Sequence, residues 1–213
     1  MMESPLVDAA RAWVIEYYPY NRHHLLKALE WLDRVAPDST EAVRLATLTH
    51  DMERAFPGPD QPVIKTLSDP EYERLHSLRS ARIVGAWLRE RHAKEALVEH
   101  VEALIVAHEF GGWPEADLVQ AADSLSFLET NIDLFLGFIR KGSDEGQTGV
   151  RPGSAPRLTP IHGKYPAHEV RKKFTQMFER IQIPRLKILA QPLLDRALQQ
   201  LDAVETAVQG APD

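Results

Sequence analysis

Apolar residues recur at helical spacing along most of this chain, and prolines separate one run from the next. Between about Asn21 and Val35, for example, Leu25, Leu29 and Leu32 lie three or four positions apart, which places them on one face of a helix. Pro37 then closes this segment, because proline cannot continue a helix. No segment shows the alternation of apolar and polar residues that is typical of a half-buried strand. The sequence therefore predicts an all-α fold.

The same pattern divides the whole chain into helices. The expected helices are Leu6–Tyr17, Asn21–Val35, a helix that ends near His50, Pro70–His92, Lys94–His108, Glu115–Arg140 and Tyr165–Val208. At the start of the helix that leads to His50, we expect Asp38 to be the N-cap residue. We expect the Glu41 side chain to hydrogen-bond back to the backbone of this cap. In the helix that begins at Pro70, we expect Leu75 and Leu78 to belong to the buried stripe.

The C-terminal helical segment is expected to break or kink near Pro184 and Pro192. Its apolar residues, Ile188 and Leu189 among them, are expected to pack onto the rest of the protein. An earlier interruption is expected near Asn131. Each of these positions lies inside a run that otherwise has helical spacing.

Two segments are expected to be connections rather than helices. Residues 56–70 contain four prolines after Phe56 and one glycine, and residues 141–164 contain five glycines and three prolines. The second connection suggests three parts: residues 1–140 form a helical bundle, 141–164 a flexible loop, and 165–213 C-terminal helices that pack on the bundle. The loop is expected to act as a lid or hinge, or to be an inert insertion.

Composition excludes several classes of protein. The chain has 213 residues, a formal net charge of -6 and no cysteine. Disulfides and thiolate ligands are therefore excluded, so a metal site must use imidazole and carboxylate groups. The acidic balance argues against nucleic acid as a partner, because nucleic-acid-binding domains are usually basic. Without a transmembrane run or a visible secretory signal, we expect a cytoplasmic protein with no membrane partner; its oligomeric state stays open.

The adjacent pair His50 and Asp51 is the most informative feature for function. It ends an apolar helical run, and an imidazole beside a carboxylate supplies two good ligands for a first-row transition metal. Four further candidates lie on separate expected helices: His24, His76, His108 and Asp123. Helices that converge in a bundle bring such residues together. The spacing therefore predicts a metal site built from several helices.

In this order and context, the residues resemble the HD superfamily of metal-dependent phosphohydrolases. Three segments carry the resemblance: His24–Ala28, Leu45–Arg54 and Ala121–Leu125. Two more resemble the branch of the superfamily that binds two metals: Leu75–Ala81 and Val101–Glu109. Together these segments lie within residues 21–128, about half of the chain. The implied fold is an HD-type helical bundle with a C-terminal helical extension.

The resemblance also implies which residues bind metal. One ion would be held by His24, His50, Asp51 and Asp123. A second would be held by His76 and His108, with Asp51 bridging both ions. The neighbouring histidines leave two alternatives open, His23 in place of His24 and His100 in place of His108. A ligand set of nitrogen and oxygen atoms suits Fe, Mn, Co, Ni or Zn, and the sequence does not choose among them.

The implied activity is hydrolysis of a small-molecule phosphate mono- or diester, with nucleotides as the first candidate substrates. Two ions about 3.5–4 Å apart clamp a phosphoryl oxygen and activate water. Asp51 would hold that water, and His76 or His108 would assist the leaving oxygen when not bound to metal. These three residues are therefore the candidate catalytic groups.

Cations near the predicted metal site are candidates for holding a substrate phosphate. These are Arg54, Lys65 and Arg180, the last within a basic C-terminal run that also includes Arg171, Lys172, Lys173 and Arg185. Glu109 is a candidate for orienting His108 or a bound water. Two other functions remain open. The ligand order also resembles the mixed-valent diiron oxygenases of the myo-inositol oxygenase type, and a non-catalytic binding module could keep the same fold.

Overall fold

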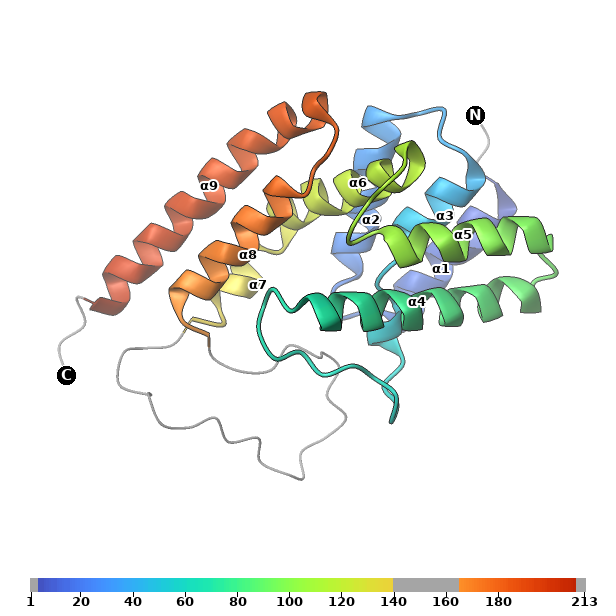
Figure 1. Ribbon diagram of the computed structural model, residues 1–213, viewed down its shortest axis with the longest axis horizontal. Coiled ribbons are helices and arrows are strands. Elements are labelled where there is room, and N and C mark those ends of the chain that lie inside the picture. The colour runs from blue at the N-terminus through green and yellow to red at the C-terminus, as the bar shows by residue number, and fades with distance from the viewer. Residues whose placement is uncertain (1–3, 140–164, 210–213) are drawn as a thin grey trace.

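The computed structural model describes residues 4–139 and 165–209, and within these ranges the fold is all-α, as predicted (Figure 1). The helices are α1 (Pro5–Tyr17), α2 (Arg22–Val35), α3 (Glu41–Thr49), the 3-10 helix η1 (Met52–Ala55), α4 (Pro70–Glu90), α5 (Glu95–Ala107), α6 (Pro114–Thr130), α7 (Ile132–Leu136), α8 (Ala167–Glu179) and α9 (Pro184–Gln209). The described backbone forms no strand, only a bridge between Ile139 and Tyr165. The predicted loop, residues 141–164, lies outside the described residues.

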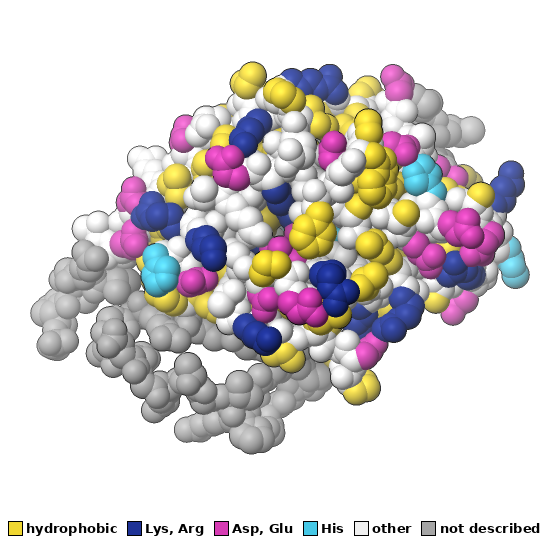
Figure 2. All heavy atoms as spheres, in the orientation of Figure 1, with side chains coloured by type: hydrophobic (Ala, Val, Ile, Leu, Met, Phe, Trp, Pro, Cys, Tyr) yellow, Lys and Arg dark blue, Asp and Glu magenta, His cyan; other side chains and the backbone are white. Residues whose placement is uncertain are grey.

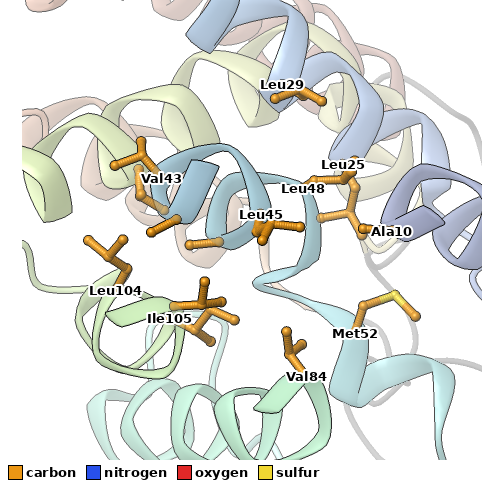
Figure 3. Close-up of a cluster of buried hydrophobic side chains, with 14 of the residues drawn as sticks. Ala10, Leu25, Leu29, Val43, Leu45, Leu48, Met52, Val84, Leu104 and Ile105 are labelled. Carbon is orange, nitrogen blue, oxygen red and sulfur yellow. The ribbon is translucent and has the colours of Figure 1, made fainter. Parts of the chain in front are cut away.

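Helix α3 lies at the centre of the first hydrophobic core. It is apolar on most of its sides, which is typical of a helix in the interior of a domain. Leu45 and Leu48 are fully buried, and they belong to one cluster with residues of α1, α2, α4 and α5 (Figure 3). Because α3 ends inside this bundle, the two residues that follow it, His50 and Asp51, are placed in the interior.

Helix α6 is shared by two hydrophobic cores. Val119 on one side belongs to the core around α3, and Leu125 belongs to a second core formed with α7, α8 and α9. In the second core the rings of Phe127, Phe135 and Phe174 contact one another. The C-terminal helices therefore lie against α6, as Figure 1 shows. This arrangement places Arg180, at the end of α8, against Asp123 and Ser124 of α6.

The N-terminus of α3 is capped by Thr40 and not, as predicted, by Asp38. Thr40 Oγ1 accepts a hydrogen bond from the Val43 backbone N–H at 3.4 Å. Glu41 accepts a hydrogen bond from the Ser4 hydroxyl instead of reaching back to a cap residue. Aspartate and threonine are both favoured at this position, so the sequence does not decide between two candidates that lie two residues apart.

The prediction that Leu75 and Leu78 are buried is wrong, because their exposed fractions are 38% and 42%. The first half of α4 instead buries polar side chains, those of His76, Ser77, Arg79 and Ser80. Polar residues are seldom buried unless they have partners, so this inward face indicates a site rather than ordinary core packing.

The C-terminal segment is broken near Pro184, as predicted, because α8 ends at Glu179 and α9 begins at Pro184; α9 then continues through Pro192 without a break. Buried residues recur every three or four positions on both sides of Pro192: Leu186, Ala190, Leu194, Ala197 and Leu201. This continuous stripe packs as one unit, although proline removes one backbone hydrogen bond. Ile188 and Leu189 lie outside the stripe with exposed fractions of 74% and 39%, so the prediction that they pack inward is wrong.

Candidate metal centre

Five helices bring the six predicted metal ligands to one place in the interior. The ligands come from α2 (His24), the end of α3 (His50 and Asp51), α4 (His76), the end of α5 (His108) and α6 (Asp123). All six side chains belong to residues with exposed fractions between 0% and 4%. Ionisable groups are rarely buried to this extent unless they are paired or coordinate a metal.

The ligand atoms form one continuous cluster. Three groups of three atoms, each within 4.8 Å of one another, come from His24, His50 and Asp123; from His50, Asp51 and His108; and from His76, His108 and Glu109. Two histidines belong to two groups each, which joins the groups. His24 Nε2 lies 3.0 Å from Asp123 Oδ1, and His76 Nε2 lies 3.1 Å from Asp51 Oδ1. These buried groups offer the nitrogen and oxygen ligands that first-row transition metals accept.

Backbone carbonyls fix the rings of His50 and His108. His50 Nδ1 lies 2.9 Å from the Thr47 carbonyl oxygen, and His108 Nδ1 lies 2.7 Å from that of Ile105. A carbonyl oxygen only accepts hydrogen bonds, so Nδ1 carries the proton in each ring. In the neutral imidazole the lone pair is then on Nε2, which faces the cluster.

Side chains hold the other two rings. His24 Nδ1 lies 2.9 Å from Ser126 Oγ, and His76 Nδ1 lies 3.2 Å from Glu53 Oε1. The buried Nε2 atoms of His50, His76 and His108 face carboxylate oxygens, those of Asp123 at 3.5 Å, Asp51 at 3.1 Å and Glu109 at 3.5 Å. Imidazoles that are fixed through Nδ1 and present Nε2 to carboxylates are typical metal ligands. The residues present therefore fit a divalent cation.

The two aspartates divide their oxygen atoms between histidines and arginines. Asp51 Oδ1 faces His76, and Oδ2 accepts a hydrogen bond from Arg54. Asp123 Oδ1 likewise faces histidines, and Oδ2 accepts a hydrogen bond from Arg180. Burial raises the pKa of both carboxyls, but the arginine charges and a neighbouring histidine outweigh it and hold each pKa well below its usual range. Both groups are therefore ionised, as metal ligands must be.

Glu109 has the same arrangement as the two aspartates. Its Oε1 atom lies 3.5 Å from His108 Nε2, and its Oε2 atom accepts a hydrogen bond from Arg180. Although burial raises the pKa of Glu109, the Arg180 charge and His108 hold it well below its usual range. The sequence suggested a role in orienting His108 or water. The geometry makes Glu109 a further candidate ligand.

The histidines differ in their affinity for protons. Burial and the Arg54 charge lower the pKa of His76, but its contacts with Asp51 and Glu53 outweigh them and raise this pKa to about 9. Burial lowers the pKa of His108, and its contact with Glu109 does not compensate. In the metal-free protein His76 is therefore cationic at neutral pH, and a metal that binds there must displace its proton.

A cavity of about 50 Å³ lies beside the cluster, and with the space that opens to solvent around it the empty volume is about 650 Å³. The metal-ligand candidates in its wall are His24, Asp51, Glu109 and Asp123. Further polar groups in the wall include those of Arg54, Tyr72, Glu73 and Lys173. The apolar part of the wall includes Phe127, Leu134, Phe135 and Met177. The lining of this pocket thus combines charged and apolar residues, which is common for a small-molecule site.

The three predicted phosphate-binding cations lie in different environments. Arg54 lines the pocket, whereas Lys65 is exposed and is not part of the pocket wall. Arg180 binds the carboxylates and is also outside the wall. Lys173, from the same basic run, does line the pocket, and its Nζ atom lies 3.1 Å from Glu73 Oε1.

The structure separates each candidate histidine from its alternative. His24 is in the cluster, whereas His23 is exposed. His108 is in the cluster, whereas His100 lies near the surface, where its Nε2 atom is 2.8 Å from Glu115 Oε2. Neither alternative is near enough to contribute to the groups of ligand atoms described above.

Comparisons of this chain with models of protein families, with curated proteins and with solved structures found no match. In residues 4–139 and 165–209, no helix combines the length and the apolar character that are needed to cross a membrane. On the face shown in Figure 2, acidic and basic side chains are interspersed. The function must therefore be inferred from the site itself.

The number of ions can be tested at His76. Replacing His76 by alanine removes one ligand from the end of the cluster that lies away from His24, so we expect metal content to fall from about two ions per chain toward one. Elemental analysis of purified protein measures this. His100→Ala is the matched control, because it removes a histidine that lies outside the cluster. An unchanged metal content in His76→Ala would favour a centre with one metal.

Proposed function

We propose that this protein is a metal-dependent phosphohydrolase that acts on a phosphate mono- or diester, as its resemblance to the HD superfamily implies. The observation that supports this most directly is the set of buried imidazoles whose Nδ1 atoms are fixed and whose Nε2 atoms face carboxylates. Such an arrangement is suited to one or two divalent transition-metal ions, Fe, Mn, Co, Ni or Zn.

A bound ion would supply Lewis acidity toward a phosphoryl oxygen and would make water a nucleophile at neutral pH. The chain would contribute the remaining functions. Asp51 Oδ1 faces the centre as an ionised acceptor, so it is placed to orient a water molecule. Burial of the cluster limits access of other water, which strengthens electrostatic interactions inside the site.

Two cations in the pocket wall support a phosphate ester as the substrate, but four carboxylates also line the wall, so attraction of an anion would depend on bound metal as well. Arg54 and Lys173 line the wall, and both are cations able to bind phosphate oxygens. The apolar residues of the wall, Phe127 and Phe135 among them, offer a surface for the organic part of the ester. A nucleotide has both parts and remains the first candidate substrate.

The proposal is tested in two steps. Protein purified without added metal is first analysed for bound metal. It is then assayed for phosphate release from a panel of mono- and diesters that includes nucleotides, with Mn or Co added. We expect bound ions and release from at least one ester class. Iron-loaded protein that releases no phosphate but consumes oxygen with a polyol or a phosphonate would contradict the proposal and favour the diiron oxygenase.

A further inference from the structure

Three hydrogen-bond donors beside Asp51 have no partner among the described residues. They are the hydroxyls of Tyr18 and Tyr72 and the Nε atom of Arg54. Tyr18 is 1% exposed and Tyr72 is 4% exposed, so water does not readily satisfy either hydroxyl. Buried donors without acceptors are rare in folded proteins and call for an explanation, such as a ligand that supplies the acceptor.

These donors belong to one local cluster. Burial is the main influence that raises the pKa of both phenols, and the charge of Arg54 and a hydrogen-bonding contact with its side chain lower it. Arginine only donates hydrogen bonds, so this contact leaves each phenol O–H without an acceptor. The Asp51 charge also acts on both. Arg54 itself donates a hydrogen bond to Asp51 Oδ2, which leaves its Nε–H without a partner. The guanidinium thus lies close to both tyrosines and to the metal-ligand cluster.

Tyr72 is held rigidly at the wall of the pocket. It lies in the first turn of α4, where the Asp69 side chain accepts a hydrogen bond from its backbone N–H at 3.3 Å. Its ring is stacked on that of His76, with a centroid distance of 5.6 Å and an interplanar angle of 6°. Tyr72, Arg54 and Asp51 all line the pocket, whereas Tyr18 does not. Tyr72 and Arg54 therefore belong to the wall that a ligand in the pocket would contact, whereas Tyr18 lies outside it.

We propose that Tyr72 and Arg54 form an anion subsite that binds the oxygen atoms of a phosphoryl group next to the metal centre. This inference rests on the proposed function, because it assigns the phosphoryl end of the substrate to this side of the pocket. A phosphoryl group is negatively charged, and its oxygen atoms accept hydrogen bonds. It therefore matches a set of donors that lack acceptors and that includes a guanidinium. Tyr72 would donate a hydrogen bond that is made only when a phosphoryl group is bound.

The test uses inorganic phosphate as the probe and calorimetry of the metal-loaded protein. Tyr72→Phe keeps the ring and its stacking on His76 but removes the hydroxyl. We expect phosphate to bind about tenfold or more weakly to this variant, since hydrogen bonds to charged groups are among the stronger ones. Metal content should stay the same. Tyr17→Phe is the matched control, because Tyr17 is 48% exposed and lies outside this pocket.

A thermal melt separates binding from a structural role. Because the Tyr72 O–H has no acceptor among the described residues, its removal should change the Tm little, whereas loss of a structural hydrogen bond donated by this hydroxyl would lower it. Tyr72→Phe that binds phosphate as tightly as the parent would overturn the subsite, as would a parent that binds no phosphate. A failure of the proposed function would give a different result: the protein would bind phosphate but would hydrolyse none of the esters.

Discussion

Replacing Asp51 with asparagine is expected to remove most of the bound metal and to abolish hydrolysis of phosphate esters. Asp51 Oδ1 lies 3.1 Å from His76 Nε2, and Asp51 also shares a group of ligand atoms with His50 and His108. Asparagine keeps the shape of the side chain but loses the charge that a cation requires. Mutation of a residue that hydrogen-bonds to a metal ligand lowers metal affinity roughly 10- to 100-fold, and loss of the ligand itself should lower it further.

Metal content after dialysis and phosphate release under saturating Mn measure this effect. Asp33→Asn is the matched control, because Asp33 is 43% exposed and pairs with Arg44 outside the cluster. We expect the control to keep the parent's metal content and activity. If the Asp51→Asn variant retained both its metal content and its activity, Asp51 would not be a metal ligand and could not bridge two ions.

The positions of the six main residues could be predicted because each lies within a local signal. His24 and His76 lie on helices whose apolar residues recur at helical spacing, Asp123 lies on a largely apolar helix, and His50 follows the apolar helix α3. Once these helices pack on one core, the polar residues they bury must meet. The meeting of these residues in one cluster could therefore be predicted from helical patterns that are visible in the sequence.

The partners of these residues could not be predicted in the same way. Ser126 contacts His24, which is 102 positions away in the chain, and Glu53 contacts His76, which is 23 positions away. Nothing in the local sequence of Ser126 or Glu53 identifies these contacts. Tyr72 has no spacing signal at all. Leu75 and Leu78 satisfied the helical pattern but face solvent, because the polar face of α4 is the one that meets the other helices. Apolar periodicity alone gives the wrong face when a helix lines a site.

The location of Arg180 depends on tertiary packing and leads to the second large prediction. Arg180 follows α8, and its side chain is 8% exposed. It binds Asp123 and Glu109, and its Nε donates to Ser124 Oγ at 2.8 Å. The sequence suggested that Arg180 holds substrate. Its contacts instead make it the counter-charge for two carboxylates of the cluster, through which the C-terminal helices contact the candidate metal centre.

Arg180→Ala is therefore expected to destabilise the metal-free protein strongly. Removing one partner of a buried ion pair costs about 3–5 kcal/mol, because it leaves an uncompensated charge, and this corresponds to a fall in Tm of roughly 6–20 °C for a chain of this size. Arg185→Ala is the matched control, because Arg185 is exposed and contacts only a backbone carbonyl, that of Val35, among its described hydrogen bonds. The control should change the Tm little.

Added metal should reverse part of the loss in Arg180→Ala. A divalent cation held by Asp123 and the histidines supplies the positive charge that the variant lacks, and any ligand that binds only the folded state raises its stability. The difference in Tm between parent and variant should therefore be smaller with Mn or Co than with a chelator. If the difference were the same in both conditions, Asp123 and Glu109 would not share their charge with a bound ion, and Arg180 would be part of a purely structural ion-pair network.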